Sequence, residues 1–268
     1  MSEKILIIGT NDNATACAQR LFRAGFGISM VSRTTPSDLF YFRNYSSVIS
    51  AGSRLINDIK AQTYADFLYH QQSKGPNLSL NTFIEFALQN RQISVLPANE
   101  FNIVSARFDY GIICDEQLYL SLKINNPELI LISCIPAKME VCKYSIVPRG
   151  PYTGHVHYPF SEFEIPAGVE DKTIIYAEDE AVFIADKTAG DKIIEGEKIA
   201  LLDNHPVLAP VEGYLAGILP SGIIVEKSQA IASISNVLTE DVKIIPQESF
   251  SIAGGVLEAI LYDQTLND

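Results

Sequence analysis

The chain contains no tryptophan, three methionines and few charged residues for its length. Charged side chains make up 19% of its 268 residues, below the roughly 25% of an average soluble domain. Hydrophobic residues reach 47%, which excludes a disordered chain and is enough for the cores of two domains. Bases are scarce, because 20 Lys and Arg against 32 Asp and Glu leave a net charge of −12. Since this field repels phosphate backbones and anionic lipids, we expect neither nucleic acid nor a membrane as a partner.

Long apolar segments and closely spaced cysteine pairs are also missing. The longest apolar run, residues 129–137, is interrupted by polar residues and is far shorter than the roughly 20 residues of a membrane-spanning helix. The start of the chain lacks the basic region of a signal peptide. The four cysteines have no C-x-x-C spacing, and most lie in apolar runs: Cys17, Cys114, Cys134 and Cys142. We therefore expect buried free thiols, a reducing cytoplasmic location and no metal site.

Short apolar strands alternate with helical patterns in the first part of the chain. Residues 4–8 form a β-branched apolar run, a polar turn follows, and residues 14–24 have helical apolar spacing that ends at Gly25. Further strands are expected at residues 28–31, 93–96, 111–114 and 129–134, with helices at 63–73 and 80–89. This alternation predicts an α/β fold, with a Rossmann-like parallel sheet domain over residues 1–145.

Residues 146–268 differ from the first part of the chain in their sequence pattern. Glycine and proline separate short predicted strands, and helical periodicity nearly vanishes. A half-repeat occurs twice, as Gly190-x-x-Ile-x-x-Gly-x-x-Ile-Ala200 and Gly222-x-x-Val-x-x-Ser-x-x-Ile-Ala232. Two such halves resemble the barrel-sandwich hybrid of biotinyl and lipoyl carrier domains. No lysine lies between Lys198 and Lys227, so we expect neither biotin nor lipoate. A terminal helix over residues 256–261 completes the mostly β domain.

The first turn occupies the place of the dinucleotide fingerprint G-x-G-x-x-G/A. It begins with Gly9, and Ala14 suits the third fingerprint position, whereas Asn11 replaces the second glycine and crowds the phosphate path. Asp12 either repels an anion or caps the helix. Arg33, after the second strand, suits a 2′-phosphate or another anion. A bound nucleotide and a purely structural turn are both compatible with this pattern.

Two polar residues are candidates for proton transfer. Asp115 ends the strand at 111–114, where ligand sites form in parallel sheets, and it is equally suited to cap the next helix. His157 belongs to His155-Val-His157, whose spacing places two imidazoles on one face of a strand. Surface histidines explain that pair more simply than a metal does, because a metal needs further ligands.

Two glycine-rich segments complete the candidate site. Arg149 and Gly150 open a turn that either receives an anion on its backbone N–H groups or simply connects the domains. Gly254 and Gly255 open the terminal helix, where they either leave N–H donors directed outward or permit tight packing of the helix on a sheet.

Taken in order, these motifs resemble the accessory proteins of selenium-dependent molybdenum hydroxylases, the YqeB-type family. The resemblance covers residues 3–34 and 109–262. It rests on the first turn, on Arg-Ala-Gly-Phe26, on the segment from Gly150 to His157, on Ala-Pro-Val-Glu-Gly213 and on Gly254-Gly-Val-Leu-Glu-Ala-Ile-Leu261. This chain departs from the family pattern at Asn11 and lacks the lysine that follows the acid in the middle strand.

The resemblance implies a role in maturing a molybdenum hydroxylase. We expect the chain to bind a nucleotide-like or pterin-like anion between its two domains, with NAD(P), another nucleotide or a molybdopterin-type ligand as candidates. Asp115 and His157 would supply polar or proton-transfer groups. Two alternatives stay open: an NAD(P)-dependent oxidoreductase, and a non-catalytic scaffold whose acidic surface binds a basic partner.

Overall fold

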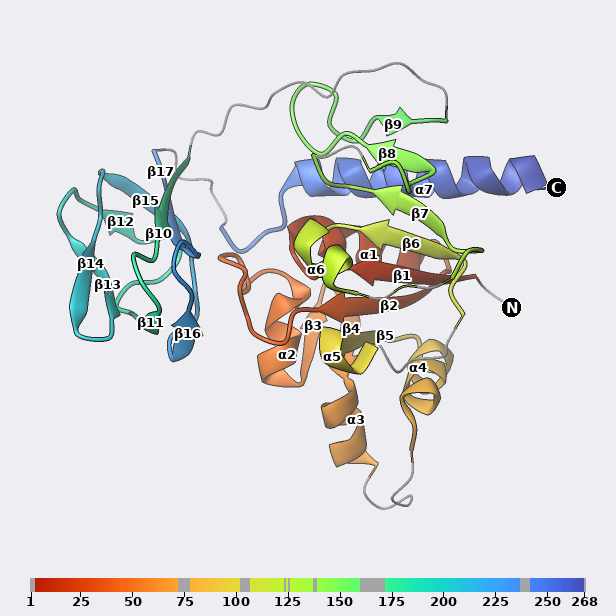
Figure 1. Ribbon diagram of the computed structural model, residues 1–268, viewed down its shortest axis with the longest axis horizontal. Helices are drawn as coiled ribbons and strands as arrows, with labels where there is room; N and C mark the ends of the chain where they lie inside the picture. Colours follow the sequence, from red (N-terminus) through yellow and green to blue (C-terminus); the bar gives the residue numbers. More distant parts are fainter. Residues whose placement is uncertain are drawn as a thin grey trace. The chain divides into compact units, whose positions relative to one another are not determined.

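The computed structural model describes residues 3–71, 78–101, 107–122, 124, 126–136, 139–159, 172–236 and 242–267. The chain forms two compact units, whose helices and strands are labelled in Figure 1. The larger unit comprises Met1–Thr34, Asn44–Gly168 and Ile245–Asp268, and the smaller one comprises Thr35–Arg43 and Val169–Ile244. The sequence places one boundary near residue 145, whereas the larger unit also includes the strands that follow and the terminal helix.

A mixed sheet lies at the centre of the larger unit (Figure 1). Its central strands, from β4 to β8, are parallel, and the strand at each edge is antiparallel to its neighbour. Within the described residues its order is β3 (Ser53–Ile56), β4 (Ile59–Thr63), β5 (Ile93–Pro97), β2 (Gly27–Ser32), β1 (Lys4–Ile8), β6 (Tyr110–Ile113), β7 (Ile130–Ser133), β8 (Tyr144–Ile146) and β9 (Val156–His157). The mixed α/β character expected from the sequence is confirmed.

Helices cover both faces of this sheet, because its central strands are apolar on both sides. In β1, Ile5 and Ile7 pack into one core, and Leu6 and Ile8 pack into the other. The helical segments are α1 (Asp12–Arg23), η1 (Tyr45–Ser47), α2 (Val48–Ala51), α3 (Tyr64–His70), α4 (Leu80–Gln89), α5 (Ala98–Phe101), α6 (Glu116–Ser121) and α7 (Gln247–Asn267). Helices α1 and α7 pack on the first core, and α3, α4 and α6 pack on the second. None of the described helices combines the length and apolarity that a bilayer crossing requires.

Helix α1 follows the expected pattern closely. The side chain of Asn11 caps its N-terminus by accepting a hydrogen bond from the backbone N–H of Ala14 at 3.0 Å. Ala14, Ala18 and Leu21 are fully buried on one face. Gly25 follows the helix with a φ of +104°, the left-handed conformation that favours glycine at a helix end.

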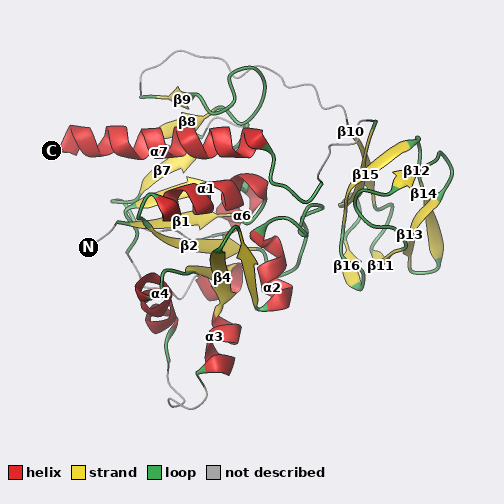
Figure 2. Ribbon diagram, turned by 180° about the vertical axis from the view of Figure 1, so that it is seen from behind, coloured by secondary structure: helices red, strands yellow, loops and turns green. Residues whose placement is uncertain are grey.

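The terminal helix requires a correction. Gly254 and Gly255 do not open it, because α7 begins earlier, at Gln247, and includes both glycines in its interior. Their N–H groups are therefore placed to bond within the helix and do not point outward. The helix packs on α1, β8 and β9 of the larger unit, and Figures 1 and 2 both show α7 alongside α1. Apolar residues of α7, which the sequence places in the second domain, thus complete the core of the larger unit.

The smaller unit contains two antiparallel four-stranded sheets, whose strands are labelled in Figure 1 and seen from behind in Figure 2. Between them, Ile193, Ile199, Val225 and Ile231 are fully buried. In order across the sheets, the described strands are β10 (Lys172–Tyr176), β17 (Ala230–Ser235), β15 (Gly213–Ile218) and β12 (Lys192–Ile193), and then β14 (His205–Leu208), β13 (Lys198–Leu202), β11 (Ala181–Ala185) and β16 (Ile223–Val225).

The two half-repeats adopt matching conformations. Gly190 and Gly222 have φ values of +100° and +85°, and the equivalent residues Gly196 and Ser228 have +78° and +64°. The buried residues correspond as well, since Ile193 and Ile199 of one copy match Val225 and Ile231 of the other. The half-repeat of the sequence therefore corresponds to a structural repeat within the smaller unit.

Candidate functional site

The turn between β1 and α1 is held by its own side chains. Gly9 has a φ of +121°, and a Cβ atom there would lie 3.3 Å from the Cβ of Asp115. Asn11 caps α1 with its side-chain oxygen, and its Nδ2 donates to the backbone carbonyl of Cys114 at 2.9 Å. Asn11 therefore joins the end of β1 to the end of β6, at the position where the fingerprint has a glycine.

Arg33 and Asp115 form an ion pair across the end of β1. The Nε and Nη2 atoms of Arg33 donate to the two carboxylate oxygens of Asp115, each at 2.8 Å. Asp115 also caps α6 by accepting a hydrogen bond from the N–H of Leu118 at 2.9 Å. The capping role that the sequence offers for Asp115 is thus present in the structure. The ion pair lies partly exposed, with 37% of the Arg33 side chain and 19% of the Asp115 side chain accessible.

These residues share one edge of the sheet. Strands β1, β2 and β6 are parallel neighbours, and Gly9, Asn11, Arg33 and Asp115 all follow their carboxyl ends. The chain order also reverses here, because β2 and β5 lie on one side of β1 while β6 and β7 lie on the other. Ligand sites of open parallel sheets form at such reversals. We refer to these four residues as the switch-point cluster.

Asp12 lies next to this cluster as the first residue of α1. Its carboxylate accepts a hydrogen bond from the side chain of Asn44 at 3.0 Å. A carboxylate in the first turn of a helix is favourable for the helix dipole. The Asp12 side chain therefore has a structural role, because it holds Asn44.

His157 lies far from Asp115. It belongs to β9, which is separated from β6 by β7 and β8. Three strand spacings of about 4.8 Å amount to roughly 14 Å, beyond the reach of a hydrogen bond between the two side chains. His155 precedes the described strand, so the two histidines are not paired on one regular strand face. The structure does not bring the expected proton-transfer residues together.

The glycine-rich segments make contacts of a different kind. Gly154 has a φ of +91°, and its carbonyl oxygen lies 2.2 Å from where a Cβ on Gly255 would be. A Cβ on Gly254 would instead meet Nη1 of Arg20 at 2.9 Å, near the end of α1 opposite Asn11. Because Asn11 and Arg20 stand about 14 Å apart along the helix, Gly254 lies well away from the switch-point cluster. The tight-packing role considered for the glycine pair matches this geometry, and Gly150 lies in an exposed turn.

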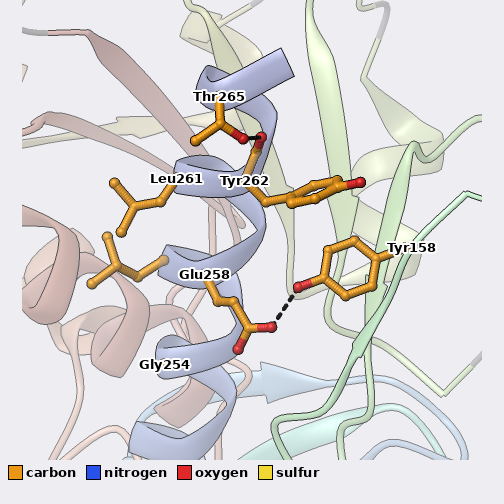
Figure 3. Close-up of a pocket in the computed structure, with 7 residues that line it drawn as sticks. Tyr158, Gly254, Glu258, Leu261, Tyr262 and Thr265 are labelled. Carbon is orange, nitrogen blue, oxygen red and sulfur yellow. Dashed lines mark hydrogen bonds between the residues drawn. The ribbon is translucent and has the colours of Figure 1, made fainter.

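A shallow groove of about 470 Å³ runs along α7 beside Tyr158, which directly follows β9 (Figure 3). Tyr158 donates a hydrogen bond to Glu258, which raises the pKa of Tyr158 to about 12. The rings of Tyr158 and Tyr262 meet edge to face at 4.6 Å between centroids. Gly254 lines this groove together with Leu257, Leu261 and Thr265.

Two clusters of functional groups were not expected from the sequence. In one, the buried carboxylate of Asp263 accepts hydrogen bonds from Lys143 at 2.6 Å, Tyr144 at 2.7 Å and Tyr110 at 3.2 Å. Burial raises the pKa of Asp263, but the bonds from Lys143 and Tyr144 outweigh it and leave the pKa below its usual value. These residues come from α7, β6 and the beginning of β8, so no local sequence motif predicts that they meet.

The other cluster consists of Cys17, Cys114 and Cys134, whose sulfur atoms all lie within 4.8 Å of one another. All three side chains are buried, which confirms the expectation for these thiols. The pKa of Cys17 falls below that of an ordinary thiol, because Cys114 and Cys134 donate hydrogen bonds to its sulfur. We refer to these three residues as the thiol cluster.

Comparison with known proteins adds a distant relative. No family model matches the chain. The chain is similar to the Escherichia coli (strain K12) protein named Uncharacterized protein YqeB. The two are 22% identical over 264 residues, which cover 96% of this chain and 47% of that protein. The chain thus spans about half the length of the curated relative that it matches. This similarity supports the resemblance to YqeB-type proteins, and the name of that protein states no activity.

Two motifs that carry the YqeB resemblance meet in the structure. The segment Gly-Pro-Tyr-Thr-Gly154 and the segment Gly254-Gly255 contact each other backbone to backbone, at Gly154 and Gly255. A third motif contains Gly25, which ends α1. These glycines therefore serve the packing of α7 and the ending of α1.

Proposed function

We propose that this protein binds a nucleotide-like or pterin-like anion at the switch-point cluster and assists the maturation of a molybdenum hydroxylase. The observation that carries the binding half is the convergence of Gly9, Asn11, Arg33 and Asp115 at the carboxyl ends of β1, β2 and β6, where the strand order reverses. On this proposal the larger unit binds its ligand as Rossmann-like domains do, at the point where the strand order reverses. The smaller unit is a barrel-sandwich hybrid without an attached cofactor.

Each residue of the cluster has a definite role in the proposed site. Gly9 brings the backbone close to Asp115 without a side chain, and the N-terminus of α1 favours a negative charge there. Arg33 supplies the cation, and Asp115 holds its guanidinium in a fixed plane by two hydrogen bonds. Asn11 fills the path that a pyrophosphate takes past a second glycine. We therefore expect the anionic group to bind on the Arg33 side of the turn.

The maturation half is supported by the YqeB-type motifs and by the 22% identity to the Escherichia coli protein. The motifs extend over both units, from the first turn to α7. In the proposal, the partner is a molybdenum hydroxylase and the anion is related to its cofactor or to a nucleotide used in preparing it. Arg149 and Gly150 lie in the turn that leads to Gly154, and they stay candidates for a second anion contact.

A ligand screen tests the binding half. The purified chain is heated with NAD(P), ATP, CTP and molybdopterin-type compounds, and the unfolding midpoint is recorded for each. We expect one of these anions to raise the midpoint of the natural protein and of Arg91→Ala, but not of Arg33→Ala. Arg91 is a matched control, because it precedes β5 at the opposite edge of the sheet. If no compound raises the midpoint, or if the Arg33 variant responds equally, the binding site is not the switch-point cluster.

Loss of the gene tests the maturation half separately. We expect molybdenum hydroxylase activity to fall in the deletion strain, to return with the natural gene and to stay low with Arg33→Ala. Unchanged hydroxylase activity would contradict the maturation role and leave the ligand screen as the test of binding. An NAD(P)-dependent oxidoreductase is the second candidate, favoured by the same parallel strand order. It predicts that NADPH both raises the midpoint and is consumed with a carbonyl substrate.

A further inference from the structure

The thiol cluster brings three cysteines together from separate elements of the larger unit. Cys17 lies on the buried face of α1, Cys114 directly follows β6, and Cys134 directly follows β7. Strands β6 and β7 are parallel neighbours, so the last two residues leave the same edge of the sheet. Cys114 is 6% exposed, Cys134 is 2% exposed and Cys17 is fully buried. Three of the four cysteines of the chain thus converge on one point, while Cys142 lies outside it.

The separation of the sulfur atoms suits a single small ion. Metal–sulfur bonds of about 2.3 Å in a trigonal plane place the sulfurs roughly 4 Å apart. The sulfurs of the thiol cluster lie within 4.8 Å of one another, a range that includes this separation. An iron–sulfur cluster needs room for several atoms between its cysteines, which this spacing does not provide.

The donor set selects the kind of ion. Thiolates favour Cu(I), zinc and iron–sulfur clusters over harder ions. Structural zinc is almost always bound by four protein ligands. Among the residues that the structure describes, no histidine, carboxylate or further cysteine joins the three sulfurs. Ile112, Ile132 and Ile146 belong to the same apolar core, and Arg20 and Asp115 are charged groups near the cluster. A three-coordinate soft ion such as Cu(I) meets these conditions.

We propose that Cys17, Cys114 and Cys134 form a buried site for one Cu(I) ion. Each thiol that binds as a thiolate releases one proton, and no electron is transferred. Binding joins α1 to the ends of β6 and β7, directly beneath the turn where Asn11 bonds to the carbonyl of Cys114. The site adjoins the switch-point cluster through Cys114, but its sulfur ligands are not part of that cluster, so the proposal does not rest on the proposed anion function.

A competition titration tests this proposal. The full chain, reduced and free of oxygen, is titrated with Cu(I) in the presence of a chromophoric Cu(I) chelator. We expect the natural protein to withdraw one equivalent of copper from the chelator. Cys17→Ala and Cys134→Ala are expected to lower the affinity by at least about 100-fold, since even the loss of outer-shell partners costs 10–100-fold. Cys142→Ala, the matched control, is expected to bind as the natural protein does.

X-ray absorption of the natural protein provides a readout that needs no variant to fold. We expect a copper ion with three sulfur neighbours at about 2.3 Å, and protection of the three thiols from alkylation. The proposal is overturned if the chelator retains all the copper, or if oxygen or nitrogen atoms dominate the copper shell. It is also overturned if Cys142→Ala weakens binding as much as Cys17→Ala, or if the chain binds Zn(II) but not Cu(I).

Discussion

The glycine pair of α7 predicts opposite effects for two neighbouring substitutions. A Cβ on Gly255 would lie 2.2 Å from the carbonyl oxygen of Gly154 and 3.0 Å from Cγ2 of Ile146. The first distance is more than 1 Å short of the 3.4 Å at which ordinary contact begins. Since the obstructing atom belongs to backbone, α7 must move away from the Gly154 turn. A Cβ on Gly254 meets only the end of the flexible Arg20 side chain.

Magnitudes follow from these contacts. Overpacking costs about 1–3 kcal/mol, and the approach to the Gly154 carbonyl places Gly255→Ala near the upper end. Alanine recovers about 1 kcal/mol of helix propensity, so the net loss for Gly255→Ala is about 2 kcal/mol. For Gly254→Ala, the same propensity gain is opposed only by movement of Arg20, and stability should rise by up to about 1 kcal/mol.

Urea unfolding of the two variants and the natural protein measures this difference, with a signal from the larger unit. The free energies of unfolding of Gly254→Ala and Gly255→Ala are expected to differ by roughly 3 kcal/mol. In thermal unfolding, the same difference corresponds to several degrees in the midpoint. Equal stabilities would refute the tight-packing role of Gly255. A loss in Gly254→Ala as large as that in Gly255→Ala would show that the helix needs flexibility at both glycines.

Further substitutions test the other contacts. Asp263→Asn removes the charged acceptor of Lys143, whose side chain is 40% exposed and can be solvated, and we expect a loss of about 2 kcal/mol at neutral pH by urea unfolding. The pKa of Asp263 is lowered in the folded state, so its contribution is present at neutral pH and declines as the pH falls below about 4. Acid unfolding should therefore be less steep in Asp263→Asn, and an unchanged acid limb would contradict this. Asn11→Ala removes the cap and the bond to Cys114, for an expected loss of about 2 kcal/mol, whereas Asn11→Gly should lose less of the capping contribution. Equal losses in both variants would contradict the capping argument.

Local patterns predicted the parts of the fold that local forces determine. The apolar run before Gly9 became β1, and helix α4 has the bounds expected from its apolar spacing. The half-repeat found in the sequence is also a structural repeat, since Gly190 and Gly222 share a positive φ. The hairpin of β3 and β4 was missed, although Asn57 and Asp58 carry a signal for it. Two residues with positive φ between apolar strands are typical of a tight hairpin turn.

The placement of α7 could not be read from local sequence. Its apolar residues are distributed around the helix, and its partner, α1, stands at the other end of the chain. The glycine pair suggested a helix start because glycine weakens a helix interior, yet Gly255 is required there by the Gly154 carbonyl. Only long-range packing reveals that requirement.

The candidate site was predicted in part. The switch-point residues converge because parallel strands end at the same edge of the sheet: Gly9, Asn11, Arg33 and Asp115. The parallel strand order is enough to predict this convergence. His157 was placed with them by its motif, but its strand lies at the far edge of the sheet. The thiol cluster escaped prediction because its cysteines are distant in sequence and come together only when α1 packs on the sheet.

Amide chemical shifts test the binding claim most directly, because they report where an anion binds as well as whether it binds. The isotope-labelled chain is titrated with the anion that raises its unfolding midpoint most. We expect the largest shifts at the backbone amides of Gly9, Asn11, Arg33 and Asp115, and we expect these shifts to be lost in Arg33→Ala. Shifts confined to Tyr158, Glu258 and Tyr262 in the groove along α7 would contradict it and place the ligand there.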